Sequence, residues 1–162
     1  MRGKQTEIEL RQFYDQWAPM VDTFCRLYLG NAEQAESVVA ESFLRYFRGE
    51  RALRLDHLPA GLMSLALEQC DQSGGEMVEV DSEFESAVLG LLPEERAVFV
   101  LHGVLDLQLP WVAAVTGIAY LTVCQLWASA LVQLRRLLDV DHGSERFPGY
   151  GLAVESRSGA CA

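Results

Sequence analysis

The chain has 162 residues, of which 50% are hydrophobic, and a formal net charge of −10. Its length suits one domain or two small ones with a sizeable core. It contains no uninterrupted run of about 18 apolar residues, and MRGKQTEIEL contains no apolar signal segment. These features predict a cytoplasmic location without a membrane span. Residues 61–100 carry nine anions and one cation, a poor composition for a phosphate-binding surface.

The first half of the chain predicts three helices. Residues 6–29 place apolar residues at the spacing of one buried helical face, and Pro19 allows a kink or a break in this helix. A Gly30-Asn31 turn separates it from a second helix over 32–47. A third, mostly buried helix follows Pro59. Three arginines between the second and third helices form a basic exit: Arg48, Arg51 and Arg54.

The second half begins with an acidic, glycine-containing segment over residues 71–83, which we predict to be a linker. Helices are expected over 84–92, 93–104 and 111–116, and a last helix follows the Gly117 turn and ends near Leu138. The fold class is therefore all-α. Two small helical domains, 6–70 and 84–140, are joined by the acidic linker, and a flexible tail covers 141–162.

Cysteine and histidine residues are scattered along the chain without metal-ligand spacing. The cysteines are Cys25, Cys70, Cys124 and Cys161, and the histidines are His57, His102 and His142. They favour reduced, mostly buried thiols over a disulfide framework or a zinc site. No Ser/His/Asp or Cys/His arrangement indicates catalysis, so we expect neither an enzyme nor a cofactor.

The order of these motifs resembles that of the extracytoplasmic-function (ECF) type of bacterial sigma factor over residues 10–138. In the first half, the resemblance is carried by Gly30-Asn31, Ala35-Glu36 and the helix ESFLRYF. The corresponding helix of the family docks on the clamp of RNA polymerase. The resemblance therefore implies a polymerase-binding role for four residues: Glu36, Glu41, Phe43 and Arg45. From its residue type alone, Phe43 fits a core position better.

In the second half, the chain is in register with the family pattern without a gap from Leu92-Pro93 through Gly117-Ile118 to Leu137-Leu138. This half resembles the helix-turn-helix domain of the family. A register of this length is more specific than an isolated helix-turn-helix.

The residues with which the family contacts nucleic acid are replaced. Ala119 stands where the family has a helix-capping Ser, and Cys124-Gln125-Leu126 stand where it has Lys-Ser-Arg. In the third helix, the stacking Trp and the cations are also absent. Few of the family's DNA-contacting side chains therefore remain. The candidates for DNA contact are Thr122, Gln125, Ser129, Arg135 and Arg136.

Two hypotheses arise from this pattern. In the first, the chain is a sigma-factor-like regulator of transcription initiation that binds core RNA polymerase, with degraded DNA-reading segments. In the second, it is a sigma-like interaction module that competes for polymerase or binds an anti-sigma factor and does not bind DNA. The last helix is uncharged from residue 119 to residue 134, which predicts a protein-contact surface or self-association. The residues of this surface are Tyr120, Leu121, Leu126 and Leu131.

Overall fold

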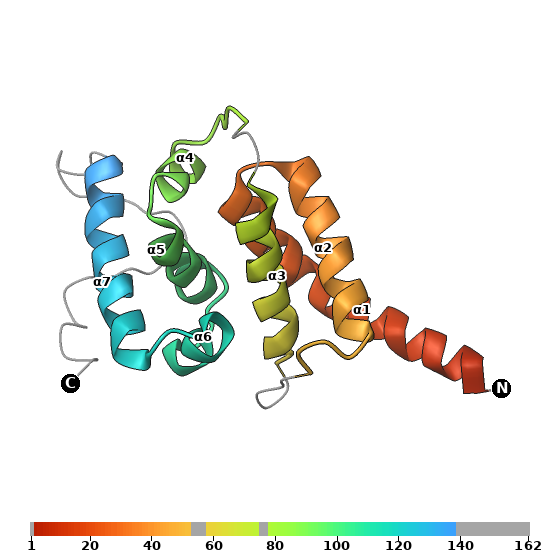
Figure 1. The fold of residues 1–162 in the computed structure, drawn as a ribbon. Coiled ribbons are helices and arrows are strands. Elements are labelled where there is room, and N and C mark those ends of the chain that lie inside the picture. The colour runs from red at the N-terminus through yellow and green to blue at the C-terminus, as the bar shows by residue number, and fades with distance from the viewer. Residues whose placement is uncertain (1, 53–57, 75–77, 139–162) are drawn as a thin grey trace. The chain divides into compact units, whose positions relative to one another are not determined.

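The computed structural model describes residues 2–52, 58–74 and 78–138, and the tail predicted over 141–162 lies outside them. The described residues form helices and contain no β-strand, which confirms the all-α class. Contacts divide the chain into two compact units, Met1–Glu79 and Val80–Ala162. We call them unit 1 and unit 2, and Figure 1 shows the helices of each.

Unit 1 consists of α1 (Arg2–Leu29), α2 (Ala32–Phe47) and α3 (Ala60–Ser73). The bounds of α2 agree with the sequence. Gly30 ends α1 at a φ of 66°, which costs glycine little. The side chain of Asn31 then caps α2 by accepting a hydrogen bond from the Gln34 backbone N–H at 3.1 Å. These two residues turn the chain so that α2 packs back on α1.

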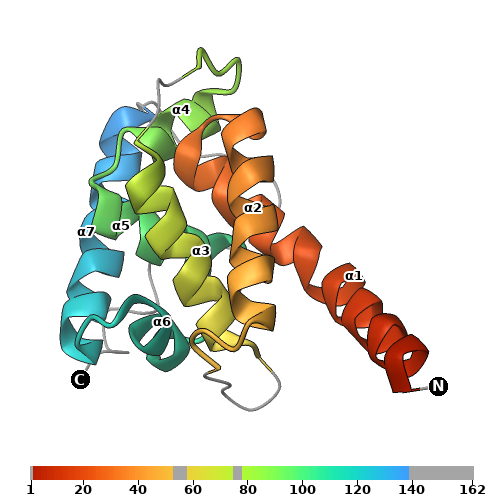
Figure 2. The same cartoon turned by 45° about the vertical axis from the view of Figure 1, so that its right-hand side comes forward.

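Pro19 does not divide the first helix, because α1 is assigned as one helix through it. Figures 1 and 2 show that α1 extends past α2 and α3 at its N-terminal end. The buried face of α1 lies further along, at Val21, Phe24 and Cys25. Its packing against α2 and α3 supports the helix beyond Pro19, where the proline ring removes one backbone donor.

The predicted linker begins later than the sequence suggested. Helix α3 continues to Ser73, three residues into the segment 71–83. The Ser73 hydroxyl donates a hydrogen bond to the Gln69 carbonyl at 2.6 Å, which satisfies a side chain that was expected in a loop. At the other end, the Ser82 side chain accepts from the Glu85 backbone N–H at 3.3 Å and starts the next helix.

Unit 2 consists of α4 (Glu83–Leu89), α5 (Pro93–Val98), η1 (Phe99–Val104), α6 (Leu109–Thr116) and α7 (Tyr120–Leu137). The sequence predicted a single α-helix over residues 93–104, but its second half is a π-helix. The Leu105 N–H accordingly bonds to the Val100 carbonyl, five residues back, at 2.9 Å. This wider turn carries Phe99, His102 and Gly103, which all contact the ring of Trp127 on α7.

Helices α6 and α7 form the predicted helix-turn-helix. They are bent by 106° at their junction, within the range of this motif. Gly117 makes the turn at a φ of 72°. Ala119 occupies the N-cap of α7 and provides no side-chain hydrogen bond, as its replacement of the expected Ser implies.

Within the described residues, no single helix is long and apolar enough to cross a membrane. The bent pair formed by α6 and α7 passes that test only by its length and composition.

Candidate functional site

The outer face of α2 carries two of the four residues predicted to bind polymerase. Glu36 and Glu41 are exposed, and Leu44, one turn beyond Glu41 toward the C-terminal end, is 50% exposed. Phe47 extends the apolar part of this face toward the end of the helix. We call these four residues the α2 face. It therefore combines acidic side chains with apolar ones.

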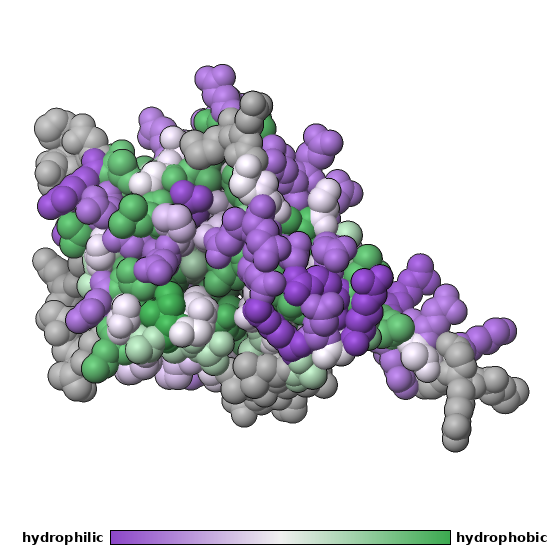
Figure 3. Space-filling model, in the orientation of Figure 1, coloured by the Kyte–Doolittle hydropathy of each residue, from purple (hydrophilic) through white to green (hydrophobic). Residues whose placement is uncertain are grey.

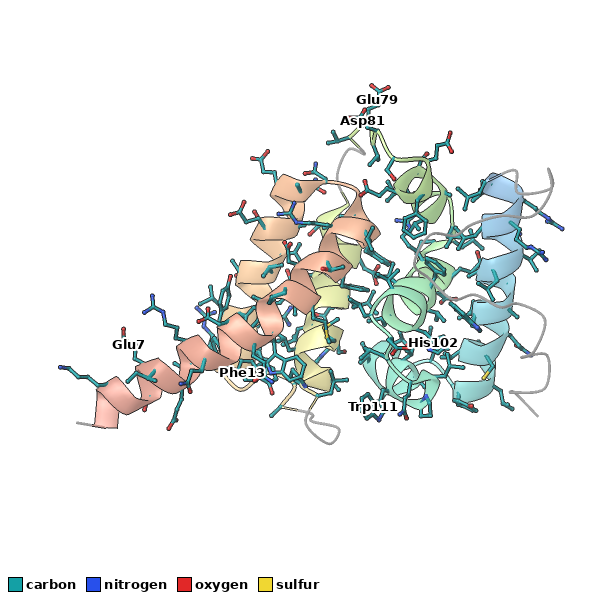
Figure 4. All side chains as sticks on the ribbon, turned by 180° about the vertical axis from the view of Figure 1, so that it is seen from behind. Glu7, Phe13, Glu79, Asp81, His102 and Trp111 are labelled. Carbon is teal, nitrogen blue, oxygen red and sulfur yellow. The ribbon has the colours of Figure 1, made fainter. Side chains whose placement is uncertain are left out.

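Phe43 is a core residue. It is 3% exposed, and its ring packs against Tyr14, Phe13 and Phe47 with centroid distances of 4.6, 6.2 and 5.8 Å. Figure 4 labels Phe13 on α1, from which it also stacks on Tyr46 at 5.4 Å. This aromatic cluster fixes α1 to α2, so Phe43 supports the α2 face from below.

Arg45 points away from the α2 face, into an ion-pair network. Its Nε lies 2.8 Å from Glu50 Oε2, and both terminal nitrogens lie 3.3 Å from Glu68 Oε1 on α3. The hydrogen bond to Glu50, with the attraction of both carboxylates, raises the pKa of the Arg45 guanidinium above its ordinary value. The guanidinium is therefore engaged within unit 1.

Glu68 holds a second arginine of the basic exit. Arg51 pairs with the Glu68 carboxylate and also donates to the Ser64 hydroxyl at 2.8 Å. Arg54 lies outside the described residues, and Arg48 is exposed. Figure 3 shows hydrophilic side chains gathered over the ends of α2 and α3. Glu68 was not a predicted site residue. The sequence did contain a signal for it, because this acid lies in a segment where the resemblance implies cations.

The predicted DNA-contact residues lie in different environments on α7. Thr122, Gln125, Arg135 and Arg136 are exposed on α7. Ser129 is used within the fold, because its hydroxyl donates to Oε1 of Glu95 on α5 at 2.5 Å. Glu95 is only 5% exposed and also accepts from the Leu92 N–H at 3.4 Å. Ser129 thus attaches α7 to a buried carboxylate.

Of the four predicted protein-contact residues on α7, two are exposed and two are half-buried. Tyr120 and Leu121 are exposed, whereas Leu126 and Leu131 are half-buried. Val132, a further apolar residue of α7, is 49% exposed. Cys124 is buried, in line with the mostly buried thiols predicted from the sequence, because it lies beside Val123 on the side of α7 that packs against the rest of the domain.

The Trp127 ring packs α7 against η1 on the same side of the helix as Val123 and Ala130, four residues after the one and three before the other. It stacks on Phe99 at a centroid distance of 5.9 Å and meets the His102 ring edge-on at 4.6 Å. His102 Nδ1 lies 2.7 Å from the Leu107 carbonyl, so this histidine has a structural partner. Figure 4 labels His102 among the helices of unit 2. In the described part of the chain, no group of three or more His, Cys, Asp or Glu could hold a metal ion.

Comparison with known proteins assigns the fold. Neither a family model nor a curated protein matches the sequence. Solved structures match over most of the chain, and two of them that contain ECF-type sigma factors align well in fold. The first is the sigma factor RpoE in complex with the anti-sigma factor NepR from Bartonella quintana, with a TM-score of 0.69 and 18% identity. It covers 82% of this chain and 98% of that one.

The second structure is CnrH in complex with the cytosolic domain of CnrY, with a TM-score of 0.70 and 20% identity. It covers 83% of this chain and 90% of that one. The fold is therefore that of ECF-type sigma factors, as the resemblance in sequence indicated.

Proposed function

We propose that the chain is a sigma-like regulator of transcription initiation that binds core RNA polymerase and does not read promoter DNA. The α2 face makes the polymerase contact, through Glu36 and Glu41 with Leu44 and Phe47 beside them. A protein that occupies the sigma site of the polymerase without reading a promoter lowers initiation by competition.

The pairing of Glu68 with Arg45 and Arg51 carries this proposal. Binding to a DNA backbone draws on cations that release counterions, and each arginine already held by a carboxylate contributes less to that release. Glu68 lies on α3, the helix in which the resemblance implies a stacking Trp and cations. The first cation on α7 is Arg135, more than four turns from the start of the helix.

The alternative is a divergent sigma factor that directs polymerase to promoters through its remaining arginines. It shares the polymerase contact with the proposed function and differs from it in DNA binding. A solved neighbour bound to an anti-sigma factor supports a further partner class for this chain, a protein that sequesters it away from polymerase.

A competition experiment tests the polymerase contact. The full chain is titrated into core RNA polymerase bound to a fluorescently labelled sigma factor, and anisotropy reports release of the label. We expect displacement, and we expect Glu36→Arg with Glu41→Arg to weaken it at least tenfold. The control is Glu9→Arg with Asp15→Arg, which makes the same charge change at exposed positions on α1.

A second arm measures retention of sheared genomic DNA by the full chain over a series of salt concentrations. Displacement without retention supports the proposal. Displacement with a steep salt dependence of DNA retention would establish the ordinary sigma-factor function instead. If the chain does not displace the labelled sigma factor, the proposed competition is wrong.

A further inference from the structure

The outward side of α7 carries a regular stripe of uncharged residues. Leu121, Gln125, Ala128 and Val132 follow one another at intervals of four, three and four residues, and all are exposed. This interval is the seam of a two-helix coiled coil, and it covers about 16 Å of helix. We call these four residues the α7 stripe.

The other described helices of unit 2 pack on the opposite side of α7 and leave the α7 stripe exposed. The contacts of α7 with α4, α5, α6 and η1 involve its opposite side, where Val123, Ala130 and Leu134 are buried. In Figures 1 and 2, those helices lie together on one side of α7. Leu121 is 66% exposed and Val132 is 49% exposed, so both ends of the stripe present large apolar side chains to solvent.

The C-terminal end of the α7 stripe is positively charged. Arg135 and Arg136 are exposed one turn beyond Val132, and α7 contains no acidic residue. A ligand that lies along the stripe therefore meets uncharged, mostly apolar side chains first and two cations last. Ala128, in the middle of the stripe, has a small side chain that allows close approach of another backbone. Duplex DNA is a poor fit, because the apolar part offers its phosphates no cation.

A second copy of the chain is also a poor fit. In a parallel pair, Arg135 would face its own equivalent, and like charges repel. In an antiparallel pair with Leu121 opposite Val132, Arg135 would lie opposite Ile118, near the N-terminal end of the other α7. Neither arrangement supplies a carboxylate, and the second places the arginine beside the positive end of a helix dipole.

We propose that the α7 stripe is the docking site for an amphipathic helix of a partner protein. That helix carries apolar residues at three- and four-residue intervals and carboxylates at the level of Arg135 and Arg136. This proposal rests on the part of the proposed function in which α7 does not read DNA, and it does not depend on polymerase binding by the α2 face. It gives the helix-turn-helix domain a protein ligand in place of a nucleic acid.

The test uses a phage-displayed library of helical peptides selected on the immobilised full chain. Enriched peptides are then synthesised, and their affinities are measured by fluorescence anisotropy. We expect enriched sequences to combine an apolar 3-4 repeat with two or more acidic residues at one end. Val132→Arg should weaken them at least tenfold, and Glu33→Arg, at an exposed site on α2, should leave them unchanged.

Reversal of charge provides the specificity readout. Arg135→Glu with Arg136→Glu should weaken the acidic peptides at least fivefold and restore binding to matched peptides in which lysine replaces the acids. Circular dichroism confirms that each variant remains helical. The proposal is overturned if no peptide is enriched, or if Val132→Arg binds the enriched peptides as well as the wild type does.

Two other occupants have their own readouts. Sedimentation that shows a dimer of the wild type and a monomer of Val132→Arg would assign the stripe to a second copy and overturn the proposal. Retention of duplex DNA that is lost in Arg135→Glu with Arg136→Glu would assign it to DNA. That last result would also contradict the proposal that the chain does not read DNA. It would not affect the proposed polymerase contact, which the displacement of labelled sigma factor tests independently.

Discussion

The Ser129 hydroxyl on α7 donates a hydrogen bond to the buried carboxylate of Glu95 on α5. This contact gives a structural role to a residue whose position in the helix-turn-helix had suggested DNA contact. Ser129→Ala should lower the free energy of unfolding of unit 2 by about 1–3 kcal/mol, because it removes a hydrogen-bond donor from a buried charged group. Urea unfolding followed by circular dichroism measures the change. The control is Ser86→Ala at an exposed site on α4, and equal stability of the two variants would contradict the assigned role.

Gly103 lies beneath the ring of Trp127. A Cβ at this position would be 3.0 Å from Trp127 Cζ3 and 3.2 Å from Phe99 Cε2. Gly103→Ala should therefore destabilise unit 2 by about 1–3 kcal/mol, because it overfills a packed contact. Thermal unfolding monitored by tryptophan fluorescence detects the loss. Gly74→Ala is the control, since a Cβ there would have no neighbour within 4 Å. An unchanged midpoint in Gly103→Ala would show that the aromatic rings shift at little cost.

Glu68→Ala should uncover the cationic character of Arg45 and Arg51. We expect the variant to elute from a heparin column at higher salt than the wild type, because both guanidinium groups become available to sulfate. Its stability should change by no more than about 1 kcal/mol, as is usual for ion pairs that are partly exposed. Glu33→Ala makes the same charge change at an exposed position of α2. Identical elution of the two variants would argue that Glu68 does not neutralise the arginines.

Cys70 makes the stability of unit 1 depend on pH above the ordinary pKa of a thiol. Its hydrogen bond with Cys25, and then its burial, raise the pKa of the Cys70 thiol far above the ordinary value of 9.0. The stabilisation is complete below pH 9 and is lost as the pH rises further, because Cys70 ionises in the unfolded chain but stays protonated in the folded one. The free energy of unfolding should thus fall by about 1.4 kcal/mol per pH unit above pH 9 from this group.

Urea unfolding at pH 8 and pH 10 with a reductant tests that dependence. Cys70→Ala serves as the comparison, since it starts from a lower stability and lacks this titration. The wild type should lose more stability than the variant between the two pH values. Equal losses would mean that other groups account for the alkaline destabilisation.

The two units should fold independently. Fragments 1–79 and 80–162 match the division of contacts along the chain, and each contains its own buried apolar residues. We expect each fragment to be helical and to unfold cooperatively on heating, as followed by circular dichroism. A fragment that shows neither helicity nor a cooperative transition would place part of its core in the other half of the chain.

Much of the fold was predictable from periodicity and turn residues. The bounds of α2 and the turn at Gly117 before α7 agree with the sequence. The π-helix was not predictable, since its six residues also fit an α-helical pattern and the wider turn is accompanied by contacts with a distant Trp127. Long-range pairing also explains Ser129 and Arg45. Each is a plausible surface residue by type, and only its neighbour on another helix reveals its structural role.

The π-helical turn over Phe99–Val104 also constrains how this domain can change in length. Such a turn holds one residue more than an α-helix of the same rise would need. Deleting one residue there would restore regular helix and rotate the residues after the deletion by about 100°. His102 and Gly103 would then leave the Trp127 ring. Single-residue deletions in this turn should accordingly be eliminated during evolution, whereas substitutions that preserve its length can persist.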